Sequence, residues 1–246
     1  MKLIDAEGTL PNYKTVRNLI QSITSKQFRL GGMYGYLIAG RVSEIVTKTC
    51  RSDTGTTPNG PYGKDFDIAD YEGNEVLVLN VKTSKRDGLP RDIGVPLNHT
   101  HEPFAKPVLE YFQSFDDEDP VFCYTRQDLY NATKNPFNGY IYPIEPYTVR
   151  DIDQNKLQII ISQVPEELQP FIRPPPSVVN ETKIPRHHRR LALHGSMRHY
   201  RIMELAQRFG LNKEERDIYT GHTTSGSDDR YSHLNWRQYF SKLLIK

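Results

Sequence analysis

The chain has 246 residues, of which 37% are hydrophobic, so it can bury the core of one large domain or two small ones. Its 32 basic residues nearly balance its 30 acidic residues, and the net charge of +2 is too small to indicate a nucleic-acid partner by itself. No apolar run comes near the roughly 20 residues of a membrane-spanning helix, and the N-terminal residues lack the apolar stretch of a secretory signal. We therefore expect no membrane span and a cytoplasmic or nucleoid location.

The first part of the chain contains two helical patterns and a loop. Apolar residues at three- and four-residue steps predict a helix from Tyr13 to about Phe28. A second helix, Met33 to Val46, should break or turn at Gly40 and leave Arg41 at the boundary. The stretch from Ser52 to Asp65 is rich in turn residues and predicts a loop.

Two runs with strand character follow this loop. EVLVLNVKTSK, from Glu75 to Lys85, alternates apolar and polar residues, and IGVPL, from Ile93 to Leu97, is its expected hairpin partner. Lys82 then lies at the far end of the first strand, next to the turn.

The middle of the chain is less regular. Short helices are expected at Pro103 to Phe112 and at Gln127 to Lys134, on either side of the acidic loop from Phe115 to Pro120. Prolines and glycines punctuate residues Asn135 to Arg186, which we interpret as an irregular insertion.

Helical patterns resume near the C-terminus. One helix should run from Met197 to Phe209 and end at Gly210, and a second from Lys213 to Tyr219. Residues 235–246 form a further helical segment. The elements together predict a single domain over residues 1–246, mainly α with a small antiparallel β-hairpin sheet, an α+β fold.

Basic residues gather in one window. TKIPRHHRRLALHGSMRHYR, from Thr182 to Arg201, holds six Lys or Arg and four His residues without a carboxylate. Such a window is a candidate phosphate-binding surface. The alternative is a solvated basic face that binds nothing.

A metal site is not favoured by the histidines or cysteines. Adjacent imidazoles among six cations repel a dication, and no carboxylate or thiolate lies near them in the sequence. Cys50 and Cys123 lack a CxxC arrangement, which excludes a zinc ribbon and a disulfide framework. We expect both cysteines to be reduced and half-buried, and we expect no metal or other cofactor. The histidines concerned are His187, His188, His194 and His199.

Five features occur in a fixed order along the chain. They are an arginine after a helix, a lysine in a hairpin, an arginine opening a helix, a histidine after glycine, and a tyrosine nine residues later: Arg41, Lys82, Arg198, His222 and Tyr231. In this order and spacing, residues 9–246 resemble the catalytic domain of the tyrosine recombinases, the phage-type integrase and Xer-like enzymes.

The resemblance implies a reaction and a role for each residue. The protein would cleave and rejoin DNA strands at specific sites through a 3′-phosphotyrosyl intermediate, with Tyr231 as nucleophile. Arg41 and Arg198 would hold the scissile phosphate with paired N–H donors. Lys82 would protonate the leaving 5′ oxygen, with Lys85 as the nearby competitor.

One histidine departs from the family pattern. The family has a histidine three residues before the second arginine, but Gly195 stands there and His194 lies one residue further back. Either the turn before the helix carries an extra residue and His194 still reaches the phosphate as base or acid, or the role is empty or filled by His187, His188 or His199.

Three other residues have weaker indications. His222 matches the position that hydrogen-bonds the phosphate, although it could instead cap a helix end. Glu44 matches an acidic position after the first arginine, where it would orient a catalytic group or be only a helix-surface carboxylate. His233 matches a frequent Tyr-x-His pattern and is interpreted as structural.

The resemblance also implies partners. The substrate would be double-stranded DNA, in the integration or excision of a mobile element, without ATP or metal. The family's N-terminal DNA-clamping module is not expected here, because only about forty residues precede Arg41. The C-terminal helix would join copies into a tetramer on DNA or pack on its own core, through Trp236, Tyr239, Phe240, Leu243 and Leu244.

Two other functions fit the same residues. A type IB topoisomerase would use the same chemistry to relax supercoils without a paired site. A catalytically inactive DNA-binding protein would use the basic window alone, but binding does not require a nucleophile, two arginines and a hairpin lysine together.

Overall fold

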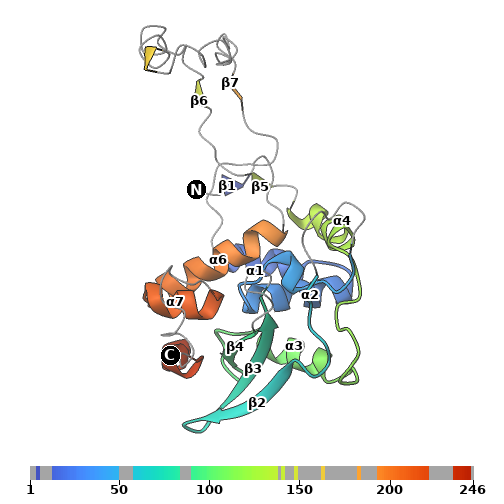
Figure 1. Cartoon of the computed structure of the whole chain (residues 1–246), viewed down its shortest axis with the longest axis vertical. Helices are drawn as coiled ribbons and strands as arrows, with labels where there is room; N and C mark the ends of the chain where they lie inside the picture. The colour runs from blue at the N-terminus through green and yellow to red at the C-terminus, as the bar shows by residue number, and fades with distance from the viewer. Residues whose placement is uncertain are drawn as a thin grey trace.

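The structure is a computed structural model, and it describes residues 4–5, 13–49, 58–83, 90–137, 140–141, 147–148, 162–163, 182–183, 193–221 and 235–244. Within these ranges, seven α-helices and a short 3-10 helix accompany a three-stranded antiparallel sheet, which confirms an α+β fold (Figure 1). The helices are α1 Tyr13–Gln21, α2 Lys26–Leu37, η1 Val42–Glu44, α3 Ala105–Phe112, α4 Arg126–Phe137, α6 Leu193–Gln207, α7 Lys213–Thr220 and α8 Arg237–Leu243. None of the helices in the described ranges is both long and apolar enough to cross a membrane.

The sheet contains the predicted hairpin and one strand that the sequence did not reveal. Strand β3, Asn74–Lys82, pairs with β4, Pro90–Pro96, as expected, and β2, Phe66–Tyr71, adds an edge strand on the other side of β3. The turn between β2 and β3 has positive φ at both Glu72 and Gly73, as two-residue hairpin turns require. Because β2 is an edge strand with mostly exposed or half-buried residues, its hydrophobic pattern is weak.

Two short strand pairs complete the described β structure. Strand β1, Ile4–Asp5, pairs with β5, Tyr140–Ile141, and β6, Tyr147–Thr148, pairs with β7, Thr182–Lys183. Most of the predicted insertion, residues 135–186, lies outside the described residues. Helix α4 extends into its first residues, as far as Phe137.

Several predicted helix boundaries were wrong by a few residues. The first helix ends at Gln21 rather than near Phe28, because a break at residues 22–25 separates it from α2. Helix α6 begins at Leu193, four residues before the predicted start, because the basic HGSMR stretch is itself helical. The predicted turn at Gly40 is confirmed, since α2 ends at Leu37 and η1 follows.

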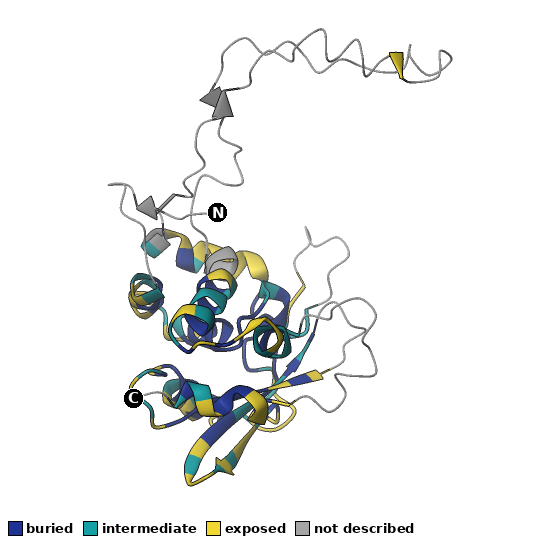
Figure 2. Ribbon diagram, turned by 90° about the vertical axis from the view of Figure 1, so that its left-hand side faces the viewer, coloured by how far each residue is buried: buried dark blue, intermediate teal, exposed yellow. Residues whose placement is uncertain are grey.

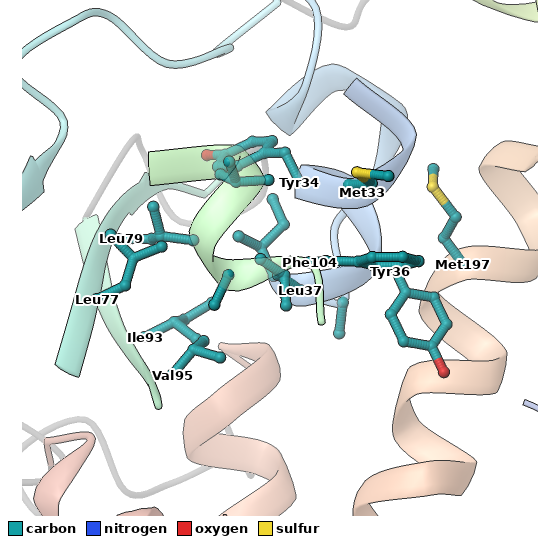
Figure 3. Close-up of a cluster of buried hydrophobic side chains, with 14 of the residues drawn as sticks. Met33, Tyr34, Tyr36, Leu37, Leu77, Leu79, Ile93, Val95, Phe104 and Met197 are labelled. Carbon is teal, nitrogen blue, oxygen red and sulfur yellow. The ribbon is translucent and has the colours of Figure 1, made fainter. Parts of the chain in front are cut away.

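Helix α2 is the centre of the core. Every residue from 30 to 40 is buried, and Figure 2 shows buried residues concentrated where the helices and the sheet face each other. In Figure 3, Leu77, Leu79 and Ile93 of the sheet lie on one side of α2 and Met197 of α6 on the other. Gly35 permits this contact, because a Cβ there would lie 2.9 Å from Met197 Cε.

The C-terminal helix packs within the chain. Trp236 lies against Gly94 of β4, and the Gly94 N–H donates to Tyr239 Oη at 3.3 Å. Phe240 and Leu243 are also buried. The predicted aromatic stripe therefore covers the chain's own sheet. Elsewhere, Cys123 is exposed rather than half-buried, and Cys50 lies outside the described residues.

Candidate functional site

The turn after α2 fixes Arg41. The chain leaves the buried helix through Ala39, whose φ is 47°, and Arg41 is the N-cap residue of η1. The Arg41 backbone N–H donates to Glu44 Oε2 at 2.9 Å, and its Nη1 lies 3.1 Å from Glu44 Oε1. One carboxylate therefore holds both the backbone and the guanidinium of Arg41.

Glu44 is a buried carboxylate shared by two arginines. Its second partner is Arg91 of β4, whose Nη1 and Nη2 donate to Oε1 at 3.4 Å and Oε2 at 3.2 Å. Burial alone would raise the pKa of Glu44, but the charge and hydrogen bonds of Arg91, together with Arg41, lower it overall. Glu44 is thus ionised in the interior, and its interpretation as a helix-surface carboxylate was wrong.

Arg198 reaches the same turn from α6. Its Nη1 donates to the Ala39 carbonyl at 2.6 Å, and its Nη2 donates to the Thr220 carbonyl at 3.3 Å, at the end of α7. Burial, then repulsion from Arg41 and Arg91, lowers the pKa of Arg198 to about 10, and Glu44 opposes this effect. The positive charges of Arg41, Arg91 and Arg198 therefore repel one another around the buried Glu44 carboxylate.

Lys82 lies at the end of β3, as predicted. Its Nζ lies 3.3 Å from Asp65 Oδ2 and 4.9 Å from the centre of the Tyr62 ring. Asp65 is buried and also accepts the Tyr62 backbone N–H at 2.8 Å. The lysine side chain is 38% exposed, so the ammonium group is held at one side and can be approached from solvent.

The end of α7 meets the ends of the sheet strands. A capping box formed by Asn212 and Glu215 begins this helix, and Gly221, with φ of 65°, ends it. A Cβ on Gly221 would lie 2.9 Å from Arg91 Cδ and 3.4 Å from Thr83 Cγ2. The residue before His222 therefore lies beside the residue after Lys82.

The structure brings together two of the predicted site residues, because Arg41 and Arg198 meet at the turn. The Lys82 ammonium group instead contacts Asp65 and the Tyr62 ring, and only its neighbour Thr83 lies beside Gly221. His194 lies within α6, four positions before Arg198, so it is not in a turn before the helix; its side chain is not described. His199 is exposed beside Tyr200. The predictions for Lys85, His187, His188, His222, Tyr231 and His233 fall outside the described residues.

Sequence reasoning missed Arg91 and Asp65. Arg91 occupies a buried position of β4 in phase with Ile93 and Val95. A charged residue in phase with core residues is the signal that could have indicated a buried ion pair. Asp65 ends the loop expected from Ser52, and nothing in its local sequence indicates the contact with Lys82.

A second arginine cluster lies further along α6. Arg201 is fully buried, with Nη2 at 2.6 Å from Glu102 Oε1 and Nη1 at 2.9 Å from Glu204 Oε2. Burial opposes its charge, but Glu102, Tyr219 and Glu204 outweigh burial and raise its pKa well above the ordinary value. The Tyr219 hydroxyl also donates to the carbonyl of Leu37, where α2 ends. This network therefore ties α6 and α7 to the end of α2.

The arrangement around Glu44 suits an oxyanion. Guanidinium groups present planar N–H donors that match the oxygens of phosphate or sulfate, and they keep their charge at neutral pH. An anion beside Arg41 and Arg198 would reduce the repulsion that lowers the pKa of Arg198. In the described part of the chain, no group of three or more His, Cys, Asp or Glu residues has the geometry to hold a metal ion.

Comparisons with known proteins do not identify this chain. No family model matches it, and the searches of curated proteins and of solved structures found no significant match. The fold accordingly carries no family assignment.

Proposed function

We propose that the protein is a site-specific DNA recombinase that cleaves and rejoins strands through a 3′-phosphotyrosyl intermediate. The observation that supports this most is the meeting of Arg41 and Arg198 at the Ala39–Arg41 turn. These arginines come from distant parts of the chain and were selected from the sequence as a phosphate clamp. The fold proposed for the chain is accordingly that of a tyrosine recombinase catalytic domain.

The proposed step transfers a phosphoryl group between two oxygens. Tyr231 Oη bonds to the phosphorus of the scissile phosphodiester while its proton passes to a base, for which His194 is the candidate. The bond from phosphorus to the 5′ oxygen breaks, and this oxygen takes a proton from Lys82. The products are a 3′-phosphotyrosine and a free 5′ hydroxyl. Attack by a second 5′ hydroxyl reverses the step and rejoins the strand.

The arginines supply the electrostatic part of this reaction. Negative charge accumulates on the non-bridging oxygens of the phosphate in the transition state, where preorganised donors stabilise it. Glu44 fixes Arg41 before DNA arrives, through contacts at 2.9 and 3.1 Å. The site therefore needs little rearrangement to receive the phosphate.

Lys82 is suited to protonate the leaving oxygen. Asp65 holds its ammonium group at 3.3 Å, and the side chain remains partly exposed. The adjacent residue, Thr83, faces Gly221, which precedes the proposed phosphate ligand His222. The strand end that carries Lys82 thus lies near the segment that leads to His222.

A covalent trapping experiment tests the function. The probe is a library of nicked duplexes of randomised sequence, in which a short 5′-hydroxyl strand diffuses away after cleavage and leaves the adduct trapped. We expect a DNA-linked form of the native chain, with the modified peptide mapping to Tyr231, and none with Tyr231→Phe. A native chain that traps no sequence, or an adduct formed by Tyr231→Phe, would contradict the proposal.

The trapped sequence then separates recombination from simple strand relaxation. A recombinase joins two DNA molecules that carry the recovered site, whereas a type IB topoisomerase relaxes a supercoiled plasmid whether or not a second site is present. Relaxation without joining would replace the proposed function by the topoisomerase one. Binding without an adduct would indicate a DNA-binding protein.

The lysine assignment has its own test. Lys82→Ala should slow cleavage roughly 10²- to 10⁴-fold, the usual contribution of a general acid, and Lys85→Ala should not. Replacing the bridging 5′ oxygen by sulfur should restore the rate of Lys82→Ala, because a thiolate leaves without a proton. Rescue of Lys85→Ala instead would assign the proton donor to Lys85.

Assembly on DNA is also a proposal. We propose that copies of the chain join as a tetramer on paired sites through the C-terminal helix. Removal of residues 236–246 is not a clean test, because Trp236, Tyr239 and Phe240 are buried in the chain's own core. Light scattering of the native chain with the recovered duplex is cleaner, and a mass of one copy per duplex at saturation would contradict the proposal.

A further inference from the structure

Arg91 joins four segments that surround the site. From β4, its guanidinium contacts Glu44 of η1 at 3.2 and 3.4 Å and donates to the Ile38 carbonyl, after α2, at 3.1 Å. Its Cδ is the nearest atom to a Cβ built on Gly221, at the end of α7. The Arg91 side chain is only 7% exposed. One buried residue therefore touches the segments that carry Arg41 and lead to His222.

We propose that Arg91 is a positioning residue that sets the geometry of the phosphate site through Glu44 and Gly221. The effect of Arg91 on cleavage rests on the proposed function, whereas the effect of Arg91 on the geometry of the site does not. Arg91 acts on Arg41 through the shared carboxylate and on the start of the His222 segment through the Gly221 backbone.

Arg91 does not act as a third phosphate ligand. Its side chain is only 7% exposed, whereas Arg198 is half-buried. Both arginines bond through both terminal nitrogens, so access from solvent separates their roles. The geometry thus favours an indirect role.

The role requires arginine rather than lysine. Two nitrogens of the guanidinium contact both carboxylate oxygens of Glu44 and the Ile38 carbonyl. A lysine ammonium keeps the charge but is a single nitrogen on a flexible stem and cannot reproduce these contacts. Arg91→Lys therefore removes the positioning while it preserves the charge.

The first measurement compares cleavage with DNA affinity. For Arg91→Lys we expect the rate of adduct formation at saturating duplex to fall roughly ten- to a hundredfold, because small displacements of catalytic groups cost that much. The dissociation constant for duplex DNA should stay unchanged within error. The matched control is Arg17→Lys, in which another buried, carboxylate-paired arginine of the second cluster is replaced; its cleavage rate should stay near that of the native chain.

The second measurement does not depend on catalysis. Hydrogen exchange should quicken in Arg91→Lys at residues 38–46 and 216–221, where backbone bonds such as Glu44 N–H to the Arg41 carbonyl hold the turn. Peptides covering α3 should exchange as in the native chain. Unfolding curves of both lysine variants check that each is folded.

A pair of glycines offers a second variant. Gly221 and Gly210 both follow helices with φ near 65°, at 65° and 66°, so alanine meets the same backbone strain at each. An added Cβ meets Arg91 Cδ at 2.9 Å at Gly221 and nothing within 4 Å at Gly210. Gly221→Ala should therefore quicken exchange at residues 38–46, and Gly210→Ala should not.

Each outcome of these measurements either supports or overturns the proposal that Arg91 positions the site. Faster exchange at both segments with slower cleavage in Arg91→Lys supports it. Unchanged exchange, or faster exchange with native cleavage, overturns it, and weaker DNA binding at a native cleavage rate assigns Arg91 to phosphate contact instead. If the native chain forms no adduct, the proposed function fails, and exchange alone then decides whether Arg91 positions the site.

Discussion

Two arginine clusters on α6 differ in their balance of charge. Arg201 lies in a fully buried network in which Glu102 and Glu204 face it, and its pKa is raised. Arg198, three residues earlier and only partly buried, lies with two other arginines around Glu44, and its pKa is lowered to about 10. In the first cluster, buried carboxylates neutralise the charge of Arg201, and the cluster stabilises the fold. In the second cluster, Arg41 and Arg198 remain partly exposed, and we propose that an anion binds beside them.

The largest effect expected from this contrast is on stability. Arg201→Met should lower the free energy of unfolding by about 3 kcal/mol, because it leaves the buried Glu102 and Glu204 with Arg17 but without Arg201. Urea unfolding measures the loss, with Arg237→Met, an exposed arginine of α8, as the control. A loss no larger than that of the control would contradict a scaffold role.

The second prediction concerns Arg198, for which we expect a small change in stability and a large change in the cleavage rate. Arg198→Met should change the free energy of unfolding by less than about 1 kcal/mol, because lost hydrogen bonds and relieved repulsion oppose each other. The rate of adduct formation should fall roughly 10²- to 10³-fold, as for loss of a donor to a developing oxyanion. If Arg198→Met is as unstable as Arg201→Met, the two clusters do not differ as proposed.

The third prediction tests the anion site without DNA. Sulfate at about ten times its dissociation constant should stabilise the native chain by about 1.4 kcal/mol relative to chloride at equal ionic strength. For a chain of this size that is a rise of about 3–6 °C in Tm. Arg41→Gln and Arg198→Met should lose this rise, and Arg237→Met should keep it. Equal shifts in all variants would indicate a general salt effect.

The smallest expected effect is a difference in how the free energy of unfolding depends on pH. Burial alone would raise the pKa of Glu44, but Arg91 and Arg41 lower it overall. A carboxyl with a lowered pKa contributes stability that is complete above its unfolded value of 4.5 and is lost as pH falls through the folded value. The native chain should therefore lose stability more steeply than Glu44→Gln below pH 4.5. Parallel curves from urea unfolding would contradict an ionised, arginine-bound Glu44.

Local patterns predicted much of the fold and part of the site. The turn at Gly40 and the pairing of β3 with β4 were correct, because they follow from turn residues and strand alternation within short segments. Edge strand β2 was missed, because an exposed strand has no clear apolar face. Helix ends shifted by several residues, since termini depend on tertiary contacts as well as on sequence.

The sequence by itself determined the set and order of the candidate residues. Arg41 falls after a helix, Lys82 at the end of a strand and Arg198 in a helix, and each of these places follows from neighbouring residues in the chain. Only the tertiary structure decided which side chains share a carboxylate. Glu44 and Arg91 lie 47 positions apart, and Lys82 and Asp65 lie 17 apart. Folding brings these partners together from separate segments, and no local pattern encodes which residue pairs with which.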